Sequence, residues 1–119
     1  MREVQESVTL NEYQALAQRT SNPALDLKGH LFNGILGLAG EAGECADLVK
    51  KHYFQDNRPI IHLLEDELGD VLWYVAETAA AIGVTLEEVA QHNVDKLRRR
   101  YPEGFSADRS LHREVNGDA

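Results

Sequence analysis

The chain has 119 residues, of which 43% are hydrophobic and 27% are charged, and its formal net charge is −8. This composition is typical of one globular domain, and the negative charge argues against binding to a nucleic-acid polymer. No apolar stretch reaches the roughly 20 residues of a membrane span, and the single cysteine, Cys45, fits a reducing cytoplasm.

The apolar pattern predicts helices and no strand, and therefore an all-α fold. Turn residues and capping signals place four helices at about residues 9–19, 28–53, 60–82 and 85–100. Thr9 and Thr85 each precede a glutamate by three residues, which is the spacing of a capping box. We expect a single domain over residues 1–119, with its core at about 9–106 and a polar tail at 107–119 that is either loosely held or in contact with a neighbour.

The two long helices each carry an apolar face, which favours an antiparallel pair joined by a short loop. These faces are Leu31, Ile35, Leu38, Ala42, Cys45 and Val49 on one helix, and Ile61, Leu64, Leu68, Val71, Val75 and Ile82 on the other. The first long helix also has a glycine at every third position: Gly34, Gly37, Gly40 and Gly43. Each glycine costs about 1 kcal/mol relative to alanine. We therefore expect another helix or a ligand to approach this backbone closely, and a merely weak helix is the alternative.

Two acidic pairs border these apolar faces. Glu41 and Glu44 form E-x-x-E on one long helix, and the other carries Glu67 and Asp70 as E-x-x-D. A spacing of three residues keeps each pair on one side of its helix, so helix packing would bring four carboxylates to one edge. A divalent cation would relieve their repulsion, and Mg²⁺ suits carboxylate ligands together with substrate phosphates, with Mn²⁺ as a substitute. Solvated surface glutamates are the alternative.

Further polar side chains share the acidic side of their helices. They are His30, Asn33, Lys51, Tyr74, Asn93, Lys96 and Arg100. Lysine and arginine suit phosphate oxygens, whereas histidine, asparagine and tyrosine suit a base or a sugar. Each has a structural alternative, which is the start of the helix for His30 and Asn33, core packing for Tyr74, the helix dipole for Lys51, and a solvated surface for Lys96 and Arg100. Trp73 is expected to point away from the acidic edge, and the sequence leaves the role of Glu77 open.

The motifs, taken in order, resemble those of the MazG-like all-α nucleotide pyrophosphohydrolases. The resemblance rests on the segments Gly37–Lys51, Glu67–Tyr74 and Asn93–Phe105, and it covers roughly residues 28–106. It implies a hydrolase that cleaves a nucleoside triphosphate (NTP) or its deoxy form (dNTP) between the α- and β-phosphates. The products would be the monophosphate and pyrophosphate, and the enzyme would be a homodimer or a homotetramer.

The resemblance also assigns roles to single residues. Coordination of Mg²⁺ would come from Glu41, Glu44, Glu67 and Asp70, which are also the catalytic set. The cation would activate a water, and Glu44 is our first choice for accepting the proton of that water. Phosphate contacts would come from Lys51, Asn93, Lys96 and Arg100, and contacts to base or sugar from His30, Asn33 and Tyr74.

Other functions fit the same pattern. A phosphoribosyl-ATP pyrophosphatase would cleave the same bond in another substrate. A non-catalytic regulatory protein would use its carboxylates only to bind a metal or a basic partner, and a purely structural helical bundle would use none. A metal-dependent catalytic assay separates these readings, whereas the preference for base and sugar cannot be deduced from the sequence.

Overall fold

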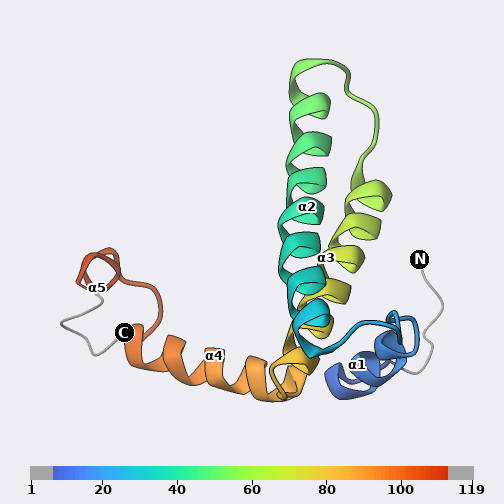
Figure 1. The fold of residues 1–119 in the computed structure, drawn as a ribbon. Coiled ribbons are helices and arrows are strands. Elements are labelled where there is room, and N and C mark those ends of the chain that lie inside the picture. Colours follow the sequence, from blue (N-terminus) through green and yellow to red (C-terminus); the bar gives the residue numbers. More distant parts are fainter. Residues whose placement is uncertain (1–6, 113–119) are drawn as a thin grey trace. The chain divides into compact units, whose positions relative to one another are not determined.

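The computed structural model describes residues 7–112, and every regular element in this range is a helix (Figure 1). The helices are α1 (Leu10–Gln18), α2 (Leu27–Phe54), α3 (Ile61–Ala81), α4 (Leu86–Arg100) and α5 (Ala107–Leu111). The predicted all-α fold is confirmed, and the four predicted helices agree with α1 to α4 within one residue at each end. No helix in the described range is both long and apolar enough to cross a membrane.

The segment expected to be a polar tail begins with a short helix, α5, over residues 107–111. Ser106 begins α5 as its N-cap, because its hydroxyl accepts a hydrogen bond from the backbone N–H of Arg109 at 3.3 Å. The Arg109 side chain in turn donates to the backbone oxygens of Arg100 and Arg99, the latter at 2.9 Å. These bonds satisfy carbonyls that the end of α4 leaves unpaired. The tail residues 113–119 lie outside the described range.

The described chain divides into two units, one that runs to Thr85 and one that begins at Leu86. The first unit holds α1, α2 and α3, and the second holds α4 and α5. The prediction of a single domain stays a prediction.

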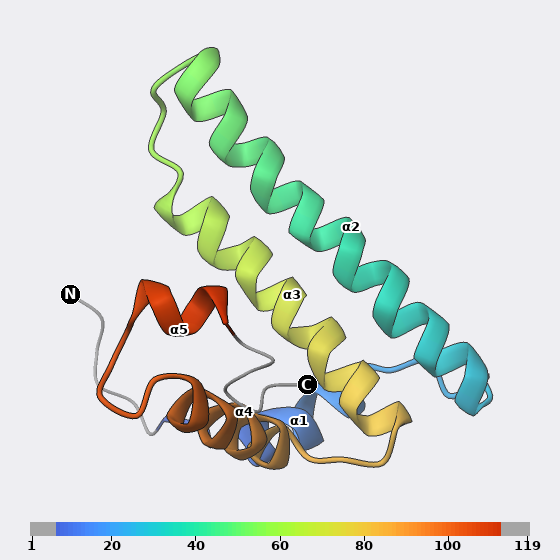
Figure 2. The ribbon, with the colours of Figure 1, turned by 90° about the vertical axis from the view of Figure 1, so that its left-hand side faces the viewer.

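In the first unit, α2 and α3 lie side by side and run antiparallel, as predicted (Figures 1 and 2). Asp26 caps the start of α2, where its carboxylate accepts a hydrogen bond from Gly29 N–H at 2.7 Å. After α3, Gly83 has a φ of 81°, a left-handed conformation that glycine adopts without strain. These two signals set the limits of the antiparallel pair.

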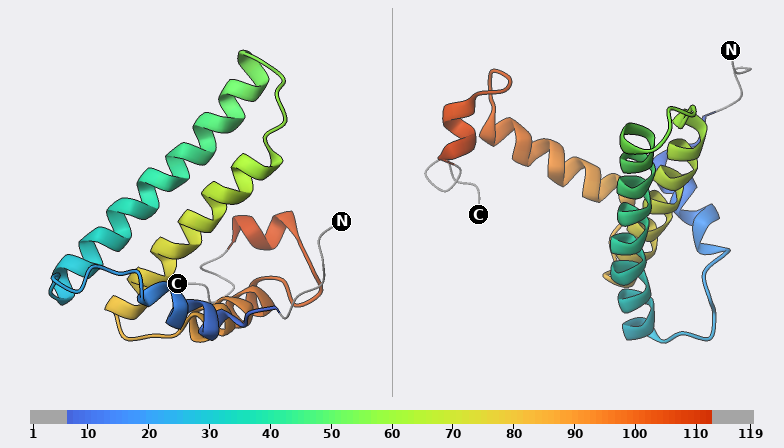
Figure 3. Two further views of the ribbon diagram at one scale, coloured as in Figure 1. Left: turned by 90° about the vertical axis from the view of Figure 1, so that its right-hand side faces the viewer. Right: turned by 90° about the horizontal axis from the view of Figure 1, so that it is seen from above.

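Helix α1 packs against α3, and Figure 3 shows the connection that leads from α1 to the start of α2. Thr9 accepts a hydrogen bond from Glu12 N–H at 3.1 Å and so caps α1. Ala17 is buried, and the buried Gln14 donates from Nε2 to the backbone oxygen of Val84 at 3.1 Å. Helix α3 therefore packs against both α2 and α1.

The glycines of α2 differ in what surrounds them. A Cβ atom on Gly34 would lie 2.3 Å from Thr78 Oγ1 and 3.1 Å from the Thr78 backbone nitrogen, and one on Gly37 would lie 2.1 Å from the Tyr74 ring. Around Gly40 and Gly43, no described atom would come within 4 Å of such a Cβ. Close approach by a helix is therefore found at two of the four glycines.

The predicted apolar faces are wrong in part. Ile35 is 48% exposed and Leu68 is 55% exposed, although both were placed on the contact face. The closest approach of α2 to α3 follows Gly34 and Gly37, and neighbouring residues are turned by about 100° around the helix. Small residues thus define the contact, and larger apolar side chains remain at the surface of the chain.

Candidate functional site

Three carboxylates from α2 and α3 form the acidic cluster, defined here as Glu41, Glu67 and Asp70. One carboxylate oxygen of each residue lies within 4.8 Å of the others. Glu41 and Glu67 are partly buried, and Asp70 is exposed. An antiparallel helix pair makes this possible, because residues far apart in sequence meet where the helices pack. The structure thus brings together three of the four expected carboxylates, in an arrangement that can hold a metal ion.

The electrostatics of the acidic cluster are unfavourable without a cation. A side-chain hydrogen bond with Glu41 raises the pKa of Glu67 above its ordinary value, and burial and neighbouring negative charges raise it further. A hydrogen bond between two carboxyl groups requires a proton on one of them. The cluster therefore favours binding either a proton or a positively charged ligand.

Glu67→Gln is expected to raise the melting temperature in EDTA at pH 7, because it removes one of the repelling charges. The raised pKa means that folded Glu67 binds its proton more tightly than the unfolded chain does. The contribution of Glu67 to the stability of the fold is therefore present below the pKa of an unfolded glutamate, about 4.3. It is lost as the pH rises through the pKa of Glu67 in the folded chain. Melting curves should show the gain of the variant shrinking between pH 7 and pH 4. A gain that does not change with pH, or one equalled by the exposed control Glu103→Gln, contradicts this account.

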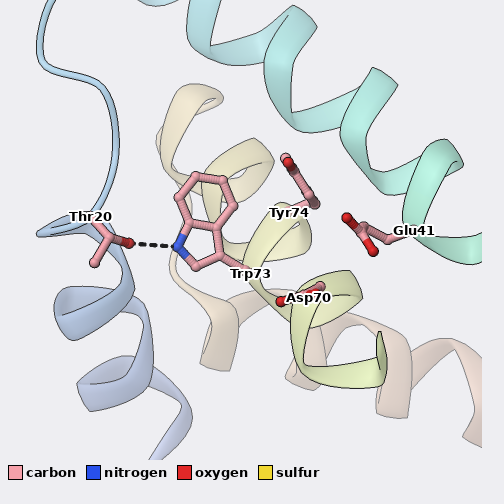
Figure 4. Close-up of a pocket in the computed structure, with 5 residues that line it drawn as sticks. All are labelled: Thr20, Glu41, Asp70, Trp73 and Tyr74. Atoms are coloured by element: carbon pink, nitrogen blue, oxygen red, sulfur yellow. Dashed lines mark hydrogen bonds between the residues drawn. The ribbon is translucent and has the colours of Figure 1, made fainter. Parts of the chain in front are cut away.

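A pocket of about 330 Å³ adjoins the acidic cluster (Figure 4). Its lining residues are Thr20, Glu41, Asp70, Trp73 and Tyr74. Small-molecule sites range from about 300 to 1,000 Å³, so the volume suits part of a small ligand. The pocket combines carboxylates on one side with aromatic rings on the other.

The aromatic wall of this pocket is held in place by the turn that follows α1. Trp73 Nε1 donates to Thr20 Oγ1 at 2.7 Å, and the Thr20 hydroxyl donates to the backbone oxygen of Ala17 at 2.6 Å (Figure 4). The rings of Trp73 and Tyr74 pack edge to face with centroids 5.0 Å apart. These contacts fix both rings, so the wall is preformed.

The expectation that Trp73 points away from the acidic edge is wrong. Trp73 follows Asp70 by three residues, and side chains with that spacing lie on neighbouring sides of a helix. The same rule, applied to Trp73, could have placed it beside the acidic cluster. The sequence offered no comparable signal for Thr20, which lies in the turn after α1, outside any motif.

Glu77, one turn beyond Trp73 on α3, is 1% exposed and accepts hydrogen bonds from four side chains. The donors are Gln18, Ser21, His30 and Asn33. Burial alone would raise the pKa of the Glu77 carboxyl, but these four hydrogen bonds together lower it below its ordinary value. His30 and Asn33, expected at a base or sugar, thus lie at a buried, ionised carboxylate.

Residues 33–105 match the MazG nucleotide pyrophosphohydrolase domain. The chain belongs to this family. It is also 45% identical over 74 residues to a protein called "Gene 37 protein" of Mycobacterium phage L5, an alignment that covers 58% of this chain and 64% of that protein. The chain thus spans less than two thirds of this relative's length. No solved structure gives a significant match. The MazG region includes the whole acidic cluster and begins inside α2.

Within the MazG region, two expected site residues of α2 lie apart from the acidic cluster. Glu44 is exposed and is not one of the three clustered carboxylates. Lys51 pairs with Asp47 at 2.7 Å, and this pairing raises the pKa of Lys51, with a smaller contribution from Glu44. Lys51 also lines a different cavity, of about 370 Å³, with Ile60. Ten residues of helix, about 15 Å, separate Lys51 from Glu41 along the axis.

The other expected phosphate ligands of the MazG region are on α4, in the second unit. Asn93 is exposed, whereas Lys96 and Arg100 are partly buried. One residue that the sequence did not suggest lies in α1, before the MazG region: burial and the negative charge of Asp70 raise the pKa of Tyr13. Tyr13 thus lies close enough to interact with the acidic cluster. Like Thr20, it is not part of any acidic motif, so only the fold reveals it.

Proposed function

We propose that the chain is a nucleoside triphosphate pyrophosphohydrolase that depends on Mg²⁺. It would cleave an NTP or dNTP between the α- and β-phosphates and release the monophosphate and pyrophosphate. The observation that carries this proposal is the acidic cluster at the edge of an aromatic pocket, in a chain of the MazG family. The acidic cluster alone would not carry the proposal, because exposed acidic groups are common on protein surfaces.

The donor set of the acidic cluster fits the proposed ion. Three carboxylates offer hard oxygen ligands, which Mg²⁺ and Mn²⁺ both prefer, and they leave coordination positions for water and phosphate. When bound, the cation supplies neutralisation of phosphate charge and activation of a water. Glu41, Glu67 and Asp70 would hold it. Glu44, less than one turn from Glu41, is the proposed fourth ligand or proton acceptor.

The aromatic wall supports a nucleotide as the ligand. Trp73 and Tyr74 present ring surfaces beside Glu41 and Asp70, so a triphosphate at the metal would place its sugar or base toward them (Figure 4). Base or sugar contacts would come from His30, Asn33 and Tyr74. Phosphate contacts would come from Lys51, Asn93, Lys96 and Arg100, as the family resemblance implies.

We also propose a homodimer or homotetramer that acts in the cytoplasm. Phe32 and Leu36 on α2, and Ile61 on α3, are among the large apolar side chains exposed in the single chain. Apolar patches of this kind mark contact surfaces between proteins. The lone Cys45 suits a reducing compartment. Sedimentation of the purified protein would establish the number of subunits.

The purified chain is expected to release pyrophosphate and nucleoside monophosphate in equal amounts from at least one NTP or dNTP with Mg²⁺. EDTA should stop the reaction, because the carboxylates alone cannot neutralise a triphosphate. Chromatography of the products across a panel of eight nucleotides is the measurement. Release of orthophosphate instead would contradict the proposed bond. If no nucleotide of the panel is cleaved, phosphoribosyl-ATP is the next substrate, and failure there would favour the non-catalytic reading.

A further inference from the structure

We infer that Glu77 is a positioning residue, which fixes His30 and Asn33 so that their outer polar atoms recognise the base of a bound nucleotide. This inference rests on the proposed function and adds to it a determinant of base selectivity. It depends on three observations, which are the saturated hydrogen bonding of Glu77, the orientation that this bonding imposes on the His30–Asn33 pair, and the place of the pair relative to the acidic cluster.

The hydrogen bonds of Glu77 occupy its whole carboxylate. Oε1 accepts from Gln18 Nε2 at 3.2 Å, and Oε2 accepts from Asn33 Nδ2 at 3.3 Å. Ser21 Oγ lies 2.8 Å from Oε1 and 3.0 Å from Oε2, and His30 Nδ1 lies 3.3 Å from Oε2. A carboxylate has about four acceptor positions, so little capacity remains for a substrate. Together with 1% exposure, this leaves Glu77 an indirect role.

The orientation of His30 follows from its two partners. Glu77 can only accept a hydrogen bond, and Ser21 gives its single proton to Glu77, although Ser21 Oγ also lies 3.2 Å from His30 Nδ1. Both partners of Nδ1 are therefore acceptors, so Nδ1 must carry a hydrogen. Nε2 is then the ring nitrogen that remains for a ligand. The His30 side chain is 23% exposed, so it can be reached from solvent.

The same reasoning orients Asn33. Because the Glu77 carboxylate accepts, the amide nitrogen of Asn33 faces it, and Oδ1 points away as an acceptor. Asn33 is exposed and follows His30 by three residues, so both side chains lie on one side of α2. The pair thus leaves His30 Nε2 and Asn33 Oδ1 as the atoms that do not face Glu77. An amino or ring N–H group of a nucleobase is the chemistry that Oδ1 would bind.

The His30–Asn33 pair contacts Glu77, which lies beyond the aromatic wall along α3, and neither residue is among those lining the 330 Å³ pocket. On α3, Asp70 at the acidic cluster is followed by Trp73 and then by Glu77, over seven residues or about 10 Å of helix. This order matches that of phosphate, sugar and base in an extended nucleotide. The α1–α2 connection joins the last two positions, because Thr20 binds Trp73 and the next residue, Ser21, binds Glu77.

Binding of the four nucleoside monophosphates, measured by calorimetry with Mg²⁺, tests the inference without requiring turnover. The wild-type chain is expected to prefer one base over the least favoured by at least about tenfold, which corresponds to about 1.4 kcal/mol. Glu77→Gln should remove most of this preference, since its amide NH₂ would oppose the donors around it. His30→Ala and Asn33→Ala should each do the same, and adding Glu77→Gln to His30→Ala should have little further effect.

Gln14→Ala is the matched control, because it breaks a different hydrogen bond of α1, the one to the backbone oxygen of Val84 after α3, and leaves the bonds of Glu77 intact. It should lower stability and leave the base preference unchanged. If Glu77→Gln does not fold, the same binding measurement is made with Ser21→Ala, which removes only one of the hydrogen-bond donors to Glu77. This variant should also weaken the base preference. A wild-type chain with no base preference, or a folded variant that keeps the full preference, overturns the inference. Base-selective binding without any cleavage would instead contradict only the proposed function.

Discussion

Asp70→Asn and Glu41→Gln are each expected to lower the rate of pyrophosphate release by on the order of 10²–10³-fold, while the helices remain intact. Each substitution removes the negative charge of one of the three clustered carboxylates. The remaining two would hold a divalent cation more weakly and place it less well. Steady-state rates at saturating Mg²⁺, together with circular dichroism, are the measurements that check this.

The matched control for these variants is Asp66→Asn. Asp66 lies on α3 and adds negative charge near Glu67, but it is not a member of the acidic cluster. Turnover of this control should stay within a few-fold of the wild type. In EDTA, the two cluster variants should melt at or above the wild-type temperature, because repulsion is relieved. Full activity in either cluster variant would remove that carboxylate from the proposed metal site.

Gly34→Ala is expected to destabilise the fold by about 1–2 kcal/mol, although alanine is the better helix former. The added Cβ would lie 3.1 Å from the backbone nitrogen and 3.2 Å from the Cα of Thr78, in addition to its overlap with the hydroxyl. A side chain can rotate away, but the backbone of α3 cannot move without separating the helices. Overpacking costs about 1–3 kcal/mol, which exceeds the gain of about 1 kcal/mol in helix propensity.

Gly40→Ala provides the comparison on the same helix. No described atom lies within 4 Å of its new Cβ, so only the propensity gain of about 1 kcal/mol remains. Urea denaturation should therefore shift the two midpoints in opposite directions with similar slopes. A similar shift for both variants would mean that α2 and α3 do not approach each other at Gly34. If Gly40→Ala is destabilised, a partner outside this chain contacts that glycine.

The sequence was informative about the helices and about the convergence of the acidic residues. Both depend on local rules, because periodicity and capping residues act within a few positions along the chain. These rules gave the bounds of α1 to α4 within one residue. They also placed the two acidic motifs on facing helices, although residues three apart are turned about 60° from each other. Glu67 and Asp70 both join the cluster across this turn, whereas on α2 only Glu41 does, so the spacing alone did not exclude Glu44.

The remainder of the site depends on contacts between distant segments, which local rules do not supply. The bond between Trp73 and Thr20 spans 53 positions of the sequence, and the bond between Ser21 and Glu77 spans 56. The short helix α5 was missed for a related reason. Its capping serine lies in a polar segment without apolar periodicity, and α5 is tied to α4 through the side chain of Arg109.

The α1–α2 connection has a consequence for how the protein can evolve. Thr20 and Ser21 contact the aromatic wall and Glu77, yet they lie before the region shared with the MazG family, as does His30. Mutations there can reshape one end of the pocket and leave the carboxylates untouched. Under the proposed function, related chains could thus diverge in nucleotide preference while their acidic motifs stay identical. Under the same proposal, ligand preference would depend on these few upstream positions rather than on the acidic motifs.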